Sequence, residues 1–158
     1  MNQNDLKNQA AEEIESLLEW INNHKNELEQ YIPEGKIEHE ALWGSSVIHK
    51  MTVDIKKGNE KAVKLACELI KDDEKYPFGK ILKSNIARAL KHQVKLINPQ
   101  EKQLIINTTK KLLTMRYSPR ETEDYCKLVA KFKDEIDLKN EFYGFKTGQD
   151  FLKRFGIF

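Results

Sequence analysis

Residues 98–121, NPQEKQLIINTTKKLLTMRYSPRE, contain two copies of one helix-start pattern and decide the fold. Each copy places a small polar residue, Asn98 or Ser118, directly before a proline and three residues before a glutamate. Proline is favoured at the first position of a helix, and the polar side chain and the glutamate can each bond the other's backbone N–H. Starts that lie 20 residues apart predict one helix and its turn, followed by a second helix.

The helical period of apolar residues continues on both sides of this stretch, and strict alternation does not persist anywhere. Gly58 and Asn59 form a helix stop and start, and the segment PEG at 33–35 ends an earlier helix. The chain has only 7 glycines and 4 prolines, too few for a turn-rich β-protein. The pattern predicts an all-α fold of about six or seven antiparallel helices. The expected helices cover about 5–32, 38–56, 59–71, 80–97, 98 onward, 118–136 and 148–154.

The expected helix pairs open with related segments, Asn59-Glu60-Lys61 and Gln100-Glu101-Lys102, which lie 41 residues apart. Over residues 38–136 the chain therefore resembles HEAT-like or armadillo-like α-hairpin repeats, which implies a right-handed stack with a binding surface. An irregular helix bundle explains the same pattern. We expect one domain over 1–158, with a long acidic N-terminal helix (1–33), a helical hairpin core (38–136) and an aromatic-rich C-terminal cap (137–158).

Charge is distributed unevenly along the chain, although the net charge is only +2. Residues 1–40 hold 3 basic and 10 acidic side chains, whereas residues 77–120 hold 10 basic and 1 acidic. On a helix from 80 to 97, the basic residues fall on one face opposite the apolar residues. This predicted basic ridge consists of Lys80, Arg88, Lys91 and Lys95, with Lys83 at its border.

Three interpretations of the basic ridge are open. It is a solvated helix face, or it binds an acidic partner, or it receives the acidic N-terminal helix of its own or a sister chain. An acidic partner is either a protein surface or a nucleic-acid backbone. Lysines that neutralise nucleic-acid phosphates release bound counterions, which favours binding. For nucleic acid the case is incomplete, because no aromatic residues interleave with the basic ones as base-stacking platforms.

The sequence contains no catalytic signature. None of the histidines pairs with another at the spacing of a zinc motif, so no metal site is predicted. The two cysteines, Cys67 and Cys126, lie in apolar helical patterns typical of small core residues. We therefore expect no cofactor and no catalytic residue, and an enzyme of an unrecognised helical class is a third alternative.

Six of the 14 aromatic residues lie in the last 17 positions of the chain. They either close the open end of the helical core or present an anchor to a partner, since aromatic residues dominate interface energetics. The candidate anchors are Phe151, Phe155 and Phe158.

The patterns together favour a small, non-enzymatic adaptor of bacterial type that binds an acidic macromolecule. An immunity- or antitoxin-like role fits such a protein, and a weakly sequence-specific nucleic-acid binder is the alternative. No apolar run is long enough for a membrane span, which favours a cytoplasmic protein without a membrane partner. The N-terminal helix has a coiled-coil spacing of apolar residues, which allows either a homodimer or packing within the chain.

Overall fold

The computed structural model describes residues 3–4, 15, 18–32, 40–71, 79–114, 121–146 and 148–157. In these residues the fold is all-α, as predicted, and contains no strand. The α-helices are α2 (Lys25–Leu28), α3 (Glu40–Lys56), α4 (Glu60–Lys71), α5 (Gly79–Leu90), α6 (Pro99–Leu113), α7 (Glu121–Ala130), α8 (Leu138–Glu141) and α9 (Gln149–Arg154). Two 3₁₀ turns, η1 (Glu29–Tyr31) and η2 (Val94–Leu96), lie among them.

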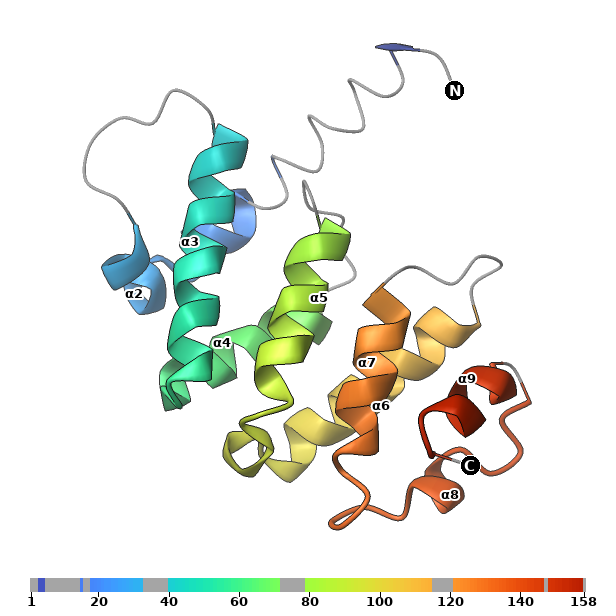
Figure 1. Cartoon of the computed structure of the whole chain (residues 1–158). Helices are drawn as coiled ribbons and strands as arrows, with labels where there is room; N and C mark the ends of the chain where they lie inside the picture. The colour runs from blue at the N-terminus through green and yellow to red at the C-terminus, as the bar shows by residue number, and fades with distance from the viewer. Residues whose placement is uncertain are drawn as a thin grey trace.

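The longer helices form two layers (Figure 1). Helices α3, α5 and α7 lie side by side and run in the same direction, while α4 and α6 cross behind them. Helix α5 therefore contacts α3, α4 and α7, which makes it the central helix of the molecule. The alternation of layers follows from short connections between antiparallel helices. The predicted resemblance to HEAT-like repeats stays a prediction.

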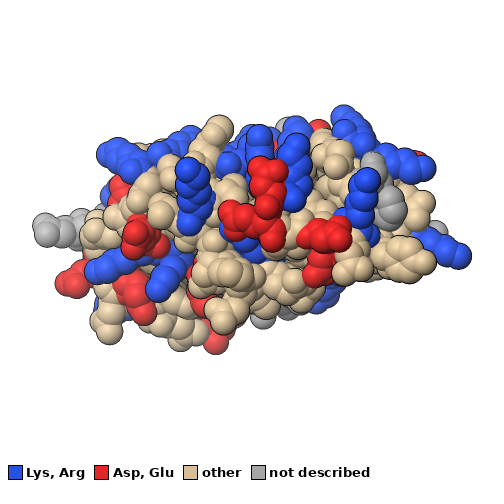
Figure 2. All heavy atoms as spheres, turned by 90° about the horizontal axis from the view of Figure 1, so that it is seen from below, with Lys and Arg blue, Asp and Glu red and all other residues tan. Residues whose placement is uncertain are grey.

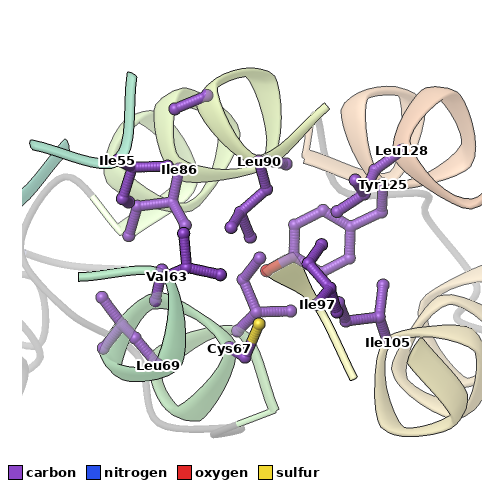
Figure 3. Packing of buried hydrophobic residues seen from close by; sticks show 14 of the residues in the cluster. Ile55, Val63, Cys67, Leu69, Ile86, Leu90, Ile97, Ile105, Tyr125 and Leu128 are labelled. Carbon is purple, nitrogen blue, oxygen red and sulfur yellow. The ribbon is translucent and has the colours of Figure 1, made fainter. Parts of the chain in front are cut away.

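The core between the layers is built from aliphatic side chains of successive helices (Figure 3). Ile55, Ile86 and Leu90 meet Val63 and Leu69 from the layer behind, and Tyr125 of α7 reaches into the same cluster. Most of these side chains are fully buried. Burial of this apolar surface is the main force that holds the layers together.

The predicted helix boundaries at Asn59 and Asn98 are confirmed. Asn98 accepts a hydrogen bond from the Glu101 N–H at 2.7 Å, and the Glu101 carboxylate accepts one from the Asn98 N–H at 3.0 Å. Gly58 has φ +82°, and the Asn59 N–H bonds the Asp54 carbonyl at 3.1 Å, which is the glycine stop expected after α3. The equivalent start at Ser118 lies outside the described residues.

The predicted helix from 80 to 97 is too long, because α5 ends at Leu90. After Leu90 the chain tightens into i→i+3 bonds, such as Gln93 N–H to the Leu90 carbonyl at 2.9 Å. The Gln93 side chain then donates to the Lys56 carbonyl at the end of α3, at 3.2 Å. This contact with α3 replaces the continued helix, so Lys95 does not share a helix with Arg88.

The predicted continuous helix from 5 to 32 is also wrong within the described part, because the helix is interrupted at His24. The His24 ring stacks on Trp20 at 4.5 Å between centroids, and its Nδ1 lies 2.8 Å from the Trp20 carbonyl oxygen. Past this break, Leu28 and Tyr31 turn into the core of the same chain. The apolar seam positions in this part are therefore occupied within the molecule. A homodimer through the remainder of that helix stays a prediction.

The C-terminal segment lies beside α6 and α7 (Figure 1), and its contacts extend along α6 from Lys102 to Leu113. Phe142 and Leu152 are fully buried in the core, and the predicted short helix near 148–154 is present as α9. Gly148 begins this last turn with φ +71°, and a Cβ there would lie 2.7 Å from Leu113 Cδ2. Only glycine allows the close approach between the start of α9 and the end of α6.

No helix in the described part is long and apolar enough to span a membrane.

Candidate binding surface

The expected basic ridge on α5 does not form one continuous exposed face. Helix α5 contacts α3, α4 and α7, and of its described side chains, those of residues 83–90, only Asn85 and Arg88 are exposed. Ser84, which a helical wheel places between Lys80 and Arg88, is buried, and Lys83 is buried with only 9% of its surface exposed. The Lys80 side chain lies outside the described residues. Sequence periodicity does not reveal that a helix will be central, so it overestimated the exposed face.

The exposed cation on this stripe, Arg88, is paired within the molecule. Its Nε donates to Asp124 Oδ1 on α7 at 3.1 Å. The arginine side chain is 53% exposed, whereas the aspartate side chain is only 7% exposed. Arg88 therefore neutralises a buried carboxylate, and only the outer part of its side chain is available to an external molecule.

Two further basic residues of the segment 77–120, Lys102 and Lys110 on α6, form ion pairs with the C-terminal segment. Lys102 is buried, pairs with Glu135 and lies 5.7 Å from the centre of the Phe132 ring. Lys110 pairs with Glu141 at 3.4 Å and lies 5.3 Å from the Phe142 ring. The acidic partners of Arg88, Lys102 and Lys110 thus come from the C-terminal third, while the N-terminal carboxylates Glu19, Glu27 and Glu29 are exposed.

Four of the lysines that reach solvent belong to two segments that are far apart in the sequence and lie side by side in the structure. The hydrogen bond from Gln93 to the Lys56 carbonyl holds η2 and the preceding turn against the end of α3. The Gln93 side chain also lies 3.6 Å from the Cβ position of Gly58. We call the lysines at this junction the lysine surface; it consists of Lys56, Lys57, Lys91 and Lys95, of which Lys91 is half-buried and the others are exposed.

The lysine surface lies at the lower end of the molecule in Figure 1, at the carboxyl ends of α3 and α5. Figure 2 views this end directly and shows lysines and arginines interspersed with aspartates and glutamates. Glu101, close in sequence to the lysines, is held by its bond to the Asn98 N–H. Positive charge at a helix carboxyl end is favoured by the helix dipole, which applies to Lys56 in the last turn of α3.

Phe155, the one candidate anchor whose side chain is described, is less accessible than Lys56, Lys57 and Lys95. Phe155 is half-buried and lies under two cations, 5.8 Å from Lys127 Nζ and 5.4 Å from the Arg154 guanidinium. Those cations also contact Glu123 at 3.3 and 3.7 Å. Phe158 and the Phe151 side chain lie outside the described residues. In the described part of the segment, the aromatic rings mainly close the core.

The thiols do not form a reactive site. Burial raises the pKa of Cys67 from 9.0 to about 12, and nearby Glu101 adds to the effect. Burial and Glu123 raise the pKa of Cys126 to about 12 as well. Both cysteines are therefore protonated at neutral pH, when a nucleophile would need to be a thiolate. The described residues contain no cluster of His, Cys, Asp and Glu that could hold a metal ion.

Sequence reasoning included Lys91 and Lys95 in a surface but missed Lys56 and Lys57. The sequence feature that could have indicated these two residues is the Lys-Lys pair directly before the predicted stop at Gly58, which marks an exposed helix end.

Comparison of the chain with protein-family models, with curated proteins and with solved structures finds no match.

Proposed function

We propose that this protein is a non-enzymatic helical adaptor that binds an acidic protein through its lysine surface. The observation that carries the proposal is the convergence of Lys56 and Lys57 with Lys91 and Lys95 from segments far apart in the sequence. A row of solvated lysines on one helix needs no partner. A cluster built from two segments presents several cations to one acidic molecule, which raises its rate of association.

The fixed backbone at this junction supports the same proposal. The Schellman turn at Gly58 and the bond from Gln93 to α3 hold both segments in place before a partner arrives. The backbone therefore loses little conformational entropy on binding, and the remaining cost is the ordering of the lysine side chains, about 0.5–1.5 kcal/mol for each one that is immobilised. An immunity- or antitoxin-like role belongs to this class of function, with a partner that has an acidic surface.

An acidic protein is favoured over nucleic acid by the residues around the lysines. Single-stranded nucleic acid is usually held by aromatic rings on which successive bases stack. Among the described side chains, Tyr143 is the only Phe, Tyr or Trp that is largely exposed, and it follows α8 rather than lying at this junction, where His92 exposes only its smaller imidazole ring. A cytoplasmic location is part of the proposal, since an adaptor of this kind acts on soluble partners.

A titration with two kinds of polyanion tests the class of partner. Fluorescently labelled poly-L-glutamate and a labelled duplex oligonucleotide are each added to the full chain at about 50 mM and about 200 mM salt. We expect saturable binding of poly-L-glutamate that weakens with salt, and weaker binding of the duplex. Tighter binding of the duplex would mean that the partner is a nucleic acid. If neither polymer binds at the lower salt, the lysine surface is not a binding site for acidic molecules.

A further inference from the structure

Helix α3 presents an exposed face that contains lysines and no carboxylate. Its side chains are described for residues 46–57, and the exposed ones among them are His49, Lys50, Val53, Lys56 and Lys57. Helix α4 differs, because its exposed side chains include both lysines and glutamates. Of the longer helices, in their described parts, only α3 exposes several lysines without an exposed carboxylate.

The lysines of this face stand on both sides of Val53, which is 37% exposed. On a helix that turns about 100° per residue, Lys50 and Lys57 lie on one side of Val53 and Lys56 lies on the other, all within about 60°. Lys50 and Lys57 are seven residues apart, which corresponds to about 10.5 Å along the helix axis. The face therefore consists of one apolar side chain flanked by cations, and it continues the lysine surface along α3.

The contacts of α3 with other elements use its opposite side. In Figure 1, α3 lies at the edge of the layer formed by α3, α5 and α7. Its buried residues Ile48, Met51 and Ile55 belong to the core. Among the described residues, no ion pair involves Lys50 or the two lysines at the end of α3. The cations of this face are therefore available to an external molecule.

The carboxylates around this face lie at its borders. Asp54 is half-buried and accepts a hydrogen bond from the Tyr31 hydroxyl, so its charge is directed toward η1. The exposed Glu27 and Glu29 lie close to Tyr31 in the sequence and therefore on the same side of α3, and the exposed Glu60 begins α4. These charges repel an acidic partner on the η1 side and beyond the end of α3, which confines the partner to the axis of α3.

The spacing of the cations indicates a helical partner. A helix that lies along α3 presents side chains on one face at intervals of seven residues, the same interval as that between Lys50 and Lys57. Such a helix can place carboxylates next to the lysines and an apolar side chain against Val53. An extended segment would direct alternate side chains away from the face, so only half of its carboxylates would meet a lysine.

We infer that the face of α3 around Val53 is a docking site for an acidic amphipathic helix of a partner protein. Carboxylates of that helix pair with Lys50, Lys56 and Lys57, and one of its apolar side chains contacts Val53. The inference rests on the proposed function for the acidic nature of the partner, and it names the kind of segment that the partner presents. It adds Lys50 and Val53 to the residues that bind.

Two synthetic peptides of about 20 residues test this inference, a length at which an alanine-rich sequence forms a helix in water. Both contain the same glutamate, leucine and alanine residues, and circular dichroism confirms that both are helical. In the first peptide the glutamates flank a leucine stripe on one face, and in the second the order is scrambled so that the carboxylates surround the helix. Their affinities are measured for the unmodified full chain and for Lys50→Glu, Val53→Thr and Lys64→Glu. The last variant is the matched control, because it reverses an exposed charge on α4, outside the face.

We expect the first peptide to bind about threefold or more tightly than the second. Its affinity should fall about fivefold or more in Lys50→Glu, about threefold in Val53→Thr and less than about twofold in Lys64→Glu. Equal losses in Lys50→Glu and Lys64→Glu, or equal affinities of the two peptides, would overturn the inference.

Labelled poly-L-glutamate separates this inference from the proposed function. If binding of that polymer depends on Lys91 and Lys95 but the first peptide is insensitive to Lys50→Glu, the docking site is refuted and the proposed function stands. If neither the polymer nor the peptides bind, both are refuted. Light scattering of the unmodified protein and of Lys50→Glu examines a different occupant. Salt-sensitive self-association that only the unmodified protein shows would assign this face to a second copy of the chain and overturn the partner helix.

Discussion

Arg88 Nε donates to Asp124 Oδ1 across 3.1 Å and joins α5 to α7 through residues 36 positions apart. The bond is asymmetric, because the aspartate side chain is buried and the arginine side chain is half exposed. Removal of the arginine would leave a buried carboxylate without its cation, which is costlier than the loss of an exposed ion pair.

We predict that Arg88→Met lowers the free energy of unfolding by about 1–3 kcal/mol, less than for a fully buried pair because water screens the exposed arginine. Adding Asp124→Asn should recover part of that loss, since the buried charge is then gone. Urea unfolding of both single variants and the double variant gives the coupling energy. A coupling energy below about 0.5 kcal/mol would show that the two side chains act independently.

Substitutions of Lys102 test whether this buried lysine stabilises the fold through its charge or through the packing of its aliphatic side-chain carbons. Its side chain is only 3% exposed and lies near Phe132, while its partner Glu135 is 51% exposed. We predict that Lys102→Met stays within about 1 kcal/mol of the unmodified protein, because Glu135 can return to water. Lys102→Ala should cost about 2–4 kcal/mol through the cavity that it leaves.

Thermal unfolding of the two Lys102 variants provides the comparison, with Lys95→Met as the control at an exposed site. Equal losses in Lys102→Met and Lys102→Ala would mean that the ion pair, rather than the packing of the stem, secures the C-terminal segment.

Tyr125 places a hydroxyl in the core beside Cys67 and Ile97 (Figure 3), and this oxygen has no hydrogen-bond partner among the described residues. We predict that Tyr125→Phe is neutral or stabilising by up to about 1 kcal/mol, because an unpaired buried hydroxyl is removed. The control is Tyr31→Phe, which loses a hydroxyl bonded to Asp54 at 2.5 Å and should cost about 1–3 kcal/mol. A destabilised Tyr125→Phe would instead indicate a hydroxyl bonded to buried water.

The two buried thiols predict a loss of stability at alkaline pH. Their folded pKa values are raised from 9.0 to about 12, so the unfolded chain releases these protons at lower pH than the folded one. Their contribution to stability is complete below pH 9.0 and is lost as the pH rises toward about 12. Urea unfolding at a series of pH values from neutral to alkaline gives the free energy of unfolding as a function of pH. This free energy should fall less steeply with pH in Cys67→Ala/Cys126→Ala than in the unmodified protein, and an equally steep fall would contradict the raised pKa values.

Local patterns predicted the all-α fold and the starts of α4 and α6. The capping bonds at Asn59 and Asn98 join neighbours in the sequence, so the residues that form them can be read directly. The end of α5 could not be predicted in this way. Directly after that end, the Gln93 side chain bonds the carbonyl of Lys56, a residue 37 positions away in the sequence.

The candidate site was predictable only in part for the same reason. The helical wheel separates apolar from basic residues on α5, but the neighbours of a helix decide how much of its polar side is buried. Ser84 and Lys83 are buried because α5 is the central helix. Lys56 approaches the segment around Lys95 only in the folded chain, so no sequence window contains the lysine surface.

The affinity of labelled poly-L-glutamate for Lys91→Glu/Lys95→Glu tests the central claim most directly, when it is compared with that for Lys64→Glu/Lys153→Glu. Both variants change the net charge equally, and Lys95, Lys64 and Lys153 are exposed. We predict a loss of about tenfold or more in the first variant at low salt and a loss of less than about threefold in the control. Equal losses in the two variants would show that the polymer responds to overall charge, and the lysine surface would then have no specific role.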